Sequence, residues 1–245
     1  MSKIEEIYGD FLRDEQQQRD PEYKEYLRAS SAGSCFKKQW FSLRQDEYKQ
    51  SELDDRVLRL LRLGTIVHAD IEKALVRYQE KNKDDIIIAT EQQIVLPDLK
   101  VVGHLDAAII HKDNDENYIQ ADIFDVKTCA SYKWRMKFGR QKETNPSFNY
   151  ELQIGTYGLG VQAKYDVDDV TLSLLWYNKD TSAMRVQEID ALKWTSEALQ
   201  YWDDCWESIN AVDNPDDMVP GVDFGVPMMD WECRYCGYTE YCKGI

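Results

Sequence analysis

The chain has no long apolar run. No stretch of its 245 residues approaches the roughly 20 consecutive apolar residues that a membrane-crossing helix requires. The opening residues, MSKIEEIYGDFLRDEQQQRD, also lack the positively charged start and apolar stretch of a secretory signal. We therefore expect a cytoplasmic protein that does not associate with a membrane.

Internal repeats and phosphate-binding loops are missing as well. The lack of repeats argues against a solenoid, and the lack of a GxxxxGKS motif argues against a helicase motor within this chain. A chain of this length can still be organised by one hydrophobic core. We therefore expect a single domain over residues 1–245.

Positive charge is scarce, with 30 Lys and Arg residues against 45 Asp and Glu residues and a formal net charge of −15. An acidic surface repels phosphate, so the overall charge argues against nucleic acid as a partner. A local basic patch, or bound divalent cations, can override the overall sign. One basic run with interleaved aromatics occurs, SYKWRMKFGRQK, and its relevant members are Lys133, Trp134, Arg135, Lys137, Phe138, Arg140 and Lys142.

Hydrophobic periodicity predicts a mixture of helices and strands. Apolar residues recur at three- and four-residue steps over residues 51–82, 147–164 and 195–212, which is typical of amphipathic helices. Helices are also predicted over the first thirty residues and from Cys35 onwards, after the turn-forming SSAGS. Residues 86–128 are predicted to form three strands, and residues 168–180 and 182–190 two more. This order predicts a mixed α/β fold with helices flanking a central sheet.

Two carboxylates and a lysine fall on neighbouring predicted strands. In FDVKT, Asp125 and Lys127 are two residues apart and project from one face. Asp106 of GHLDA lies on the preceding strand, and the intervening turn makes the strands antiparallel neighbours, so Asp106 and Asp125 converge. Such a pair can bind Mg²⁺ or Mn²⁺, which supports phosphodiester hydrolysis assisted by a lysine. An isolated DxK is otherwise an ordinary ion pair on a strand.

Two further motifs accompany these strands. LGTIVHADIEKAL carries Gly64 and His68 on a helix upstream, and YELQIGTYGLG places Gln153 and Tyr157 on one helix face downstream. In this order the four motifs resemble those of the RecB-like PD-(D/E)XK nucleases. The resemblance covers nearly the whole chain and implies the restriction-endonuclease-like fold of that class.

The resemblance implies roles for individual residues. The implied metal ligands are His68, Asp106, Asp125 and the Val126 carbonyl. The implied catalytic residues are Asp106, Asp125, Lys127, Gln153 and Tyr157, the last two contacting DNA or supporting the site. Many relatives carry Glu where this chain has Asp125, and the shorter side chain leaves the metal geometry open. Glu91 is close in sequence and is a lesser candidate for the site.

The six cysteines are unevenly distributed. Three crowd into CRYCGYTEYC and one stands near the start; these four are Cys35, Cys233, Cys236 and Cys242. Thiolates prefer soft metals, and the spacing suits either tetrahedral Zn²⁺ or an iron–sulfur cluster. Cys129 and Cys205 lie in apolar or helical settings, so we expect them to be ordinary buried thiols.

The family resemblance favours the cluster. RecB-like nucleases with an iron–sulfur cluster, among them CRISPR adaptation exonucleases and AddAB nuclease domains, place one cysteine before the nuclease motifs and three after them. This layout implies a [4Fe–4S] cluster, with Zn²⁺ as the alternative, that joins residue 35 to residues 233–242. Because the metal would close a very long loop, its binding free energy would contribute to folding.

The resemblance implies a DNA exonuclease that uses Mg²⁺ or Mn²⁺ on single strands or DNA ends, in phage or bacterial recombination, repair or CRISPR adaptation. The strand would be bound by Lys133, Trp134, Arg135, Lys137 and Arg140. This run is alternatively an amphipathic helix with inward-facing aromatics. A homo-oligomer, or a separate helicase or integrase, would be the partner. The alternative functions are a non-catalytic, metal-stabilised DNA-binding or assembly subunit, and an iron–sulfur redox protein.

Overall fold

The computed structural model describes residues 2–17, 23–81, 86–140, 147–218 and 232–242. Its strands are β1 (Leu27–Arg28), β2 (Ile86–Leu96), β3 (Val101–Lys112), β4 (Tyr118–Cys129), β5 (Val170–Asn178) and β6 (Met184–Ile189). Its α-helices are α1 (Lys3–Gln17), α2 (Phe36–Ser42), α3 (Asp55–Lys81), α4 (Ser131–Phe138), α5 (Phe148–Tyr165) and α6 (Ala191–Asn210). Short 3-10 turns are η1 (Ala29–Ser31), η2 (Pro215–Asp217) and η3 (Cys233–Tyr235).

The strands form one mixed sheet in the order β1-β3-β4-β5-β6. Strand β2 pairs with the edge of β3 that faces away from β4. The β2–β3, β3–β4 and β5–β6 pairs are antiparallel. The β4–β5 pair is parallel. Helices α4 and α5 lie between these strands in the chain and provide the crossover connection that a parallel pair needs. The predicted mixed α/β fold is therefore confirmed, including the succession of three strands, a helix and two strands.

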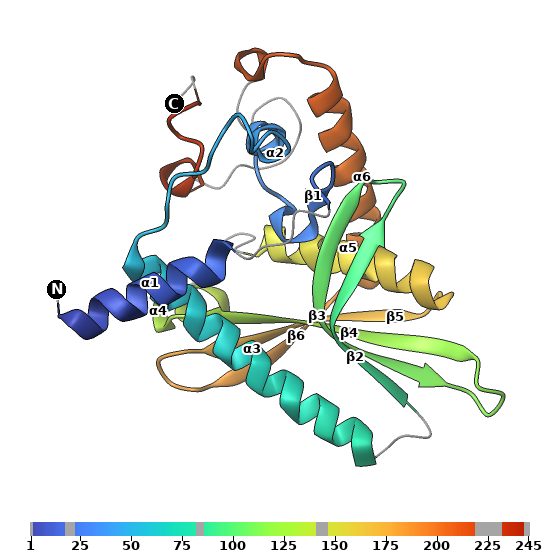
Figure 1. Cartoon of the computed structure of the whole chain (residues 1–245). Coiled ribbons are helices and arrows are strands. Elements are labelled where there is room, and N and C mark those ends of the chain that lie inside the picture. The colour runs from blue at the N-terminus through green and yellow to red at the C-terminus, as the bar shows by residue number, and fades with distance from the viewer. Residues whose placement is uncertain (1, 18–22, 82–85, 141–146, 219–231, 243–245) are drawn as a thin grey trace.

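Helices cover the sheet in layers. In Figure 1, α5 and α6 lie above the sheet and α3 lies on the opposite side. Helix α5 is buried on almost every face because it packs between the sheet and α6; its buried apolar residues include Leu152, Ile154, Tyr157 and Val161. A helix that is apolar all round suits such an interior position.

Polar side chains fix the ends of these elements. The Val57 amide donates to Asp54 Oδ1 at 2.9 Å at the start of α3, and Asp190 caps α6 by accepting from the Lys193 amide at 3.0 Å. In the predicted turn between β3 and β4, Asp113 accepts hydrogen bonds from two backbone amides of that turn. Aspartate therefore defines the boundaries of several elements.

Some predicted boundaries are wrong. The helix predicted for the first thirty residues ends at Gln17, and β1 follows because Leu27 and Arg28 pair with Val101 and Val102 of β3. Helix α6 begins at Ala191, four residues before the predicted start. Lys142 and much of the predicted C-terminal coil lie outside the described residues. Within the described ranges, none of the helices has the length and apolar character needed to cross a membrane.

Gly155 sets the distance between α5 and α6. A Cβ at this position would collide with the Trp194 carbonyl oxygen and lie 3.3 Å from the Ala198 Cβ. We expect Gly155→Ala to lower the free energy of unfolding by about 1–3 kcal/mol, since overpacking outweighs the better helix propensity of alanine. Urea denaturation measures this. Gly64→Ala in α3 is the control, since its Cβ meets only Thr128 Oγ1 at 3.2 Å; equal losses in both variants would contradict the explanation.

Candidate active site

The backbone pairing of β3 and β4 ends immediately before two aspartates. The last paired residues are Ala107 and Phe124, and the next positions along the two strands are Asp106 and Asp125. There the Val126 amide donates a 2.6 Å hydrogen bond to Asp106 Oδ2. The carboxylate of Asp106 thus replaces a backbone acceptor. Beyond this point a side chain of β3, and not its backbone, bonds to β4.

Asp125 is a buried carboxylate with poor hydrogen bonding. Its side chain is 1% exposed, and Lys127 Nζ lies 2.7 Å from Oδ2. Despite this short distance, neither oxygen accepts a hydrogen bond of acceptable geometry from the described residues. Burial raises the pKa of Asp125 to about 6, with Lys127 opposing the shift and Asp106 adding to it. A divalent cation would satisfy such oxygens, so the residues present fit a metal.

Lys127 is held by the two helical residues of the QxxxY motif. Its Nζ donates to Gln153 Oε1 at 2.8 Å, and Gln153 Nε2 donates to the Tyr157 hydroxyl at 3.0 Å. Burial lowers the pKa of Lys127, but Asp125, Asp106 and Tyr150 outweigh it, and the net shift is upwards. The structure therefore brings Lys127, Gln153 and Tyr157 together, with the ammonium group charged and oriented.

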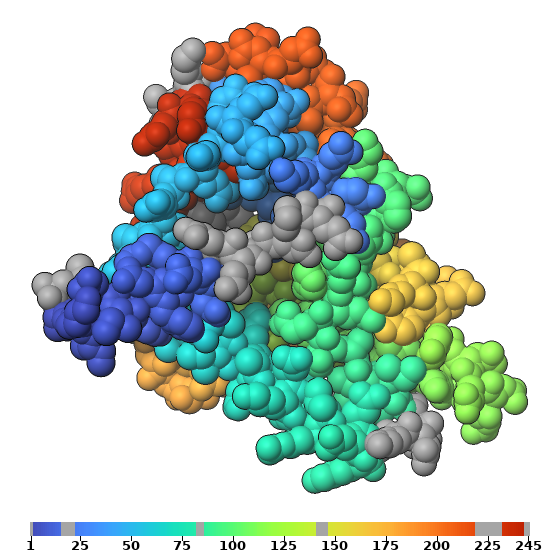
Figure 2. All heavy atoms as spheres, viewed as in Figure 1, coloured from blue at the N-terminus to red at the C-terminus, as the bar shows by residue number. Residues whose placement is uncertain are grey.

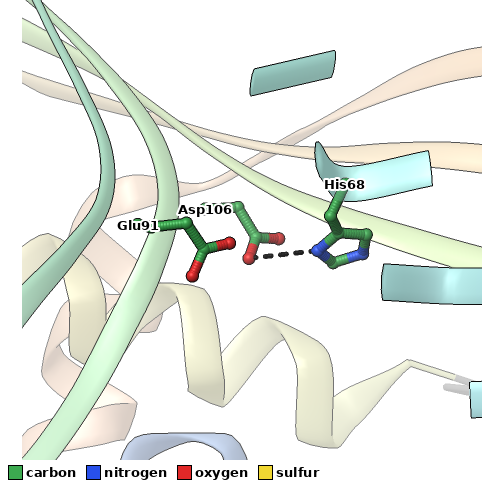
Figure 3. Close-up of side chains that lie close together, drawn as sticks. All are labelled: His68, Glu91 and Asp106. Atoms are coloured by element: carbon green, nitrogen blue, oxygen red, sulfur yellow. Dashed lines mark ion pairs between the residues drawn. The ribbon is translucent and has the colours of Figure 1, made fainter. Parts of the chain in front are cut away.

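His68 approaches the same place from α3. Its Nδ1 lies 3.3 Å from Asp106 Oδ1, and Figure 3 shows this pair beside the carboxylate of Glu91. One ligand atom from each of His68, Glu91 and Asp106 lies within 4.8 Å of the other two. Burial lowers the pKa of His68, but the hydrogen bond and charge of Asp106 and the charge of Asp125 reverse this shift. These three side chains form a group that could hold a metal ion.

Glu91 occupies an unusual backbone position. It lies within β2, where Thr90 pairs with Ala107 and Gln92 pairs with Leu105, which places Glu91 across from Asp106. Its φ is 47°, a left-handed conformation that a non-glycine residue adopts at a cost of about 1–3 kcal/mol. Sequence reasoning made Glu91 only a lesser candidate, because its proximity to Asp106 depends on the register of two strands.

The basic run forms α4, and its side chains divide into two sets. Lys133 Nζ donates to the Tyr150 hydroxyl at 2.9 Å, and Lys137 contacts Ser147 and lies 3.9 Å from Glu151. Trp134 and Phe138 pack on each other and against the core. Arg135 and Arg140 are exposed. The aromatics and lysines thus make internal contacts, and the two arginines are available to a polyanion.

The four predicted cysteine ligands meet in one pocket. Cys35, Cys233, Cys236 and Cys242 line one pocket that is partly open to solvent. The Cys35 amide donates to Glu232 Oε1 at 2.8 Å, which joins α2 to the C-terminal segment. Figure 2 shows this segment, in red, against α2. The two remaining cysteines, Cys129 and Cys205, are buried elsewhere, at 4% and 0% exposure.

The cysteine pocket also contains a buried lysine. Lys37 is 1% exposed, and its Nζ lies 3.9 Å from Asp216 Oδ1. Four thiolates around a metal or cluster carry net negative charge, which a nearby buried ammonium would offset. Burial raises the pKa of Cys35 to about 11 and also raises that of Cys242, where Lys37 opposes the shift. Metal binding would have to displace these protons. The residues present fit a thiolate-bound metal.

Comparisons with known proteins bear on the fold and on the family. No curated protein matches the chain. The crystal structure of SSO0001 is similar at 17% identity and a TM-score of 0.52, covering 98% of this chain and 96% of that chain. A predicted exonuclease from Eubacterium rectale is similar at 16% identity and a TM-score of 0.50, covering 84% and 87%. These likenesses concern the fold. The model of one family matches residues 4–243, and the chain belongs to the PD-(D/E)XK nuclease superfamily.

Proposed function

We propose that this chain is a metal-dependent DNA exonuclease of the RecB-like subtype, forming a single nuclease domain over residues 1–245. The observation that carries the proposal is the buried Asp125 carboxylate, which faces Lys127 at 2.7 Å and accepts no hydrogen bond of acceptable geometry from the residues that the structure describes. Burying a carboxylate in this state costs stability, so a sheet without a binding role is better off without it. In a site that binds a cation and a phosphate, the same carboxylate would serve as a metal ligand.

The proposed metal ligands are the side chains of His68, Asp106 and Asp125 together with the Val126 carbonyl. The carboxylate and carbonyl oxygens of this set are hard ligands that suit Mg²⁺ or Mn²⁺. A divalent ion bound there would polarise the scissile phosphate and make bound water more acidic. The hydrogen bond from the Val126 amide to Asp106 orients that carboxylate.

Lys127 acts beside the reacting phosphate in this proposal. Its ammonium group can stabilise negative charge that develops on a phosphoryl oxygen. Gln153 and Tyr157 fix its position through consecutive hydrogen bonds of 2.8 and 3.0 Å. Because both side chains are buried, their bonds are protected from exchange with water. These two residues therefore position Lys127.

The finer parts of the proposal rest on the sequence motifs. The arrangement of one cysteine before the nuclease motifs and three after them supports a [4Fe–4S] cluster, and the four cysteines of this arrangement line one pocket. Degradation from ends, with a preference for single strands or DNA ends, follows from the RecB-like resemblance, and a similar fold occurs in the predicted exonuclease from Eubacterium rectale. Recombination, repair or CRISPR adaptation, with a separate helicase or integrase, would be the setting.

Replacing Asp125 tests the nuclease. We expect Asp125→Asn to reduce Mn²⁺-dependent degradation of end-labelled single-stranded DNA at least about 100-fold, because the metal site loses a charged ligand. Asp122→Asn is the matched control on the same strand, since Asp122 pairs with His111 at 2.7 Å away from the site. It should retain activity. Circular single strands should resist the wild-type protein if digestion starts at ends.

Three results would contradict all or part of this proposal. DNA degradation that survives Asp125→Asn would place the activity elsewhere or in a contaminant. Binding of DNA without cleavage, with every divalent metal tried, would instead favour a non-catalytic DNA-binding subunit. Cleavage of circular strands would leave a nuclease but remove the requirement for ends.

The cysteine pocket has its own test. We expect the anaerobically purified chain to be brown, with broad absorption near about 400 nm, and Cys236→Ser to lose this absorption and unfold at a lower temperature. Cys129→Ser is the control, because Cys129 is buried outside the pocket; it should keep the colour. A colourless wild-type protein containing Zn²⁺ would exclude the cluster and keep a thiolate metal site.

The exposed Arg135 and Arg140 indicate that bound DNA would run along α4. We expect Arg135→Ala combined with Arg140→Ala to weaken binding of single-stranded DNA in Ca²⁺ and to make the logarithmic salt dependence shallower by about 0.7 for each lost phosphate contact. Arg77→Ala is the control, because Arg77 is exposed on α3. Fluorescence anisotropy at several salt concentrations measures the slope. An unchanged slope in the double variant would exclude this path.

A further inference from the structure

We propose that Tyr150 is a positioning residue for Lys127, and that it links this lysine to Lys133 of α4. The inference rests on the proposed function, because the role of Lys127 is to act beside a reacting phosphate. It adds a residue that the nuclease motifs do not include. It also assigns the Lys133 ammonium group to the Tyr150 side chain, and leaves phosphate contacts on α4 to the exposed arginines.

The ring of Tyr150 lies close to two ammonium groups. Lys127 Nζ is 4.7 Å from the ring centroid, and Lys133 Nζ is 4.5 Å from it. A cation within about 6 Å of an aromatic centroid is attracted by the electrons of the ring face, more strongly where water is excluded. The Lys127 side chain is only 16% exposed. The ring therefore helps to hold the lysine that the proposed reaction uses.

Tyr150 joins two other partners of Lys127. Asp125 Oδ2 lies 2.7 Å from Nζ, and Gln153 Oε1 accepts a 2.8 Å hydrogen bond from it. Tyr150 precedes Gln153 by about one turn of α5, so the two side chains project from the same face of this helix. The ammonium group is thus bounded by a strand residue and by two residues of one helix. A group held in this way needs little reordering when a phosphate oxygen arrives.

The Tyr150 ring is itself held in place. Lys133 Nζ donates a 2.9 Å hydrogen bond to its hydroxyl. The ring of Trp176 packs against it, with centroids 5.7 Å apart and an interplanar angle of 63°, and Trp176 belongs to the buried core. A ring that is bonded at its hydroxyl and packed on a buried indole has a defined orientation. Through this ring, the position of α4 affects the position of Lys127.

Substitutions at Tyr150 test the role of the ring. Tyr150→Leu is expected to lower kcat for Mn²⁺-dependent cleavage of single-stranded DNA by about 3- to 30-fold, the range that a cation–π contact represents, with KM nearly unchanged. Tyr150→Phe keeps the ring and should retain most of the activity. Tyr165→Leu is the matched control at the other end of α5, because Tyr165 is also half-buried, hydrogen-bonds Gln92 at 2.9 Å and packs edge-on against Tyr118. It should keep kcat.

Lys133→Met distinguishes positioning from contact with DNA. We expect it to lower kcat and to leave unchanged both the affinity for single-stranded DNA in Ca²⁺ and the salt dependence of that affinity. The variant without Arg135 and Arg140 should show the opposite pattern, with weaker binding and a shallower slope. If Lys133 contacted a phosphate, its loss would make the slope shallower by about 0.7. That result, with kcat unchanged, would overturn the link to α4.

A measurement without DNA separates this inference from the nuclease. In protein with ¹³C-labelled lysine and Mg²⁺, the ring current of Tyr150 should move the Lys127 Hε resonances upfield. The shift should persist in Tyr150→Phe and disappear in Tyr150→Leu, with Lys127→Arg identifying the signal. If DNA is cleaved but the resonances are unshifted, or if Tyr165→Leu loses as much kcat as Tyr150→Leu, the inference fails and the nuclease stands. If the resonances are shifted and no DNA is cleaved, the contact exists but the proposed function fails, and the role of Tyr150 in it fails too.

Discussion

The end of the β3–β4 hydrogen-bond ladder is the constraint on which the site depends. Up to Ala107 and Phe124 the strands satisfy each other's backbone groups, and beyond them the Val126 amide turns to Asp106. If the β3–β4 hydrogen-bond ladder continued, the Val126 amide would not be free to orient the Asp106 carboxylate. At this point α3 brings His68 to Asp106, and α5 brings Gln153 to Lys127. The chemistry is thus located by where the regular structure stops.

Charge at the site contrasts with charge over the molecule. The net charge of −15 makes most of the surface unattractive to a polyanion. A cation bound by His68, Asp106 and Asp125, as proposed, would turn a local excess of negative charge into a phosphate-binding point. The exposed arginines of α4 would extend it. An acidic protein of this design would engage DNA only where metal is present, which restricts contact to the place where a strand can be cut.

The fold was largely readable from the sequence, because hydrophobic periods and turn residues are local signals. The polar turn at Asp113 made β3 and β4 neighbours, and this predicted the approach of Asp106 to Asp125. The four-residue spacing of Gln153 and Tyr157 likewise placed them on one face of α5. In each case neighbouring residues or a tight turn carried the information.

What could not be read depends on long-range packing. Strand β1 forms because Leu27 and Arg28 meet β3, although nothing nearby in sequence indicates an extended pair. The position of Glu91 requires the register of β2 on β3 and a left-handed backbone angle. The inward contacts of Lys133 and Lys137 require Tyr150 and Ser147, which lie beyond the run in sequence. The sequence therefore left open whether this run contacts DNA or packs inward, and the structure has inward lysines and exposed arginines.

The hydrogen bond between the Cys35 amide and Glu232 has a consequence for biosynthesis. Its partners are 197 positions apart in the chain. At about 5–20 residues per second, a ribosome needs roughly 10–40 s to make the residues between them. During that interval α2 lacks its C-terminal cover, and Phe41 lacks its stacking partner Tyr238. The nascent chain therefore exposes this aromatic surface until residues 232–242 have been synthesised and can pack against α2.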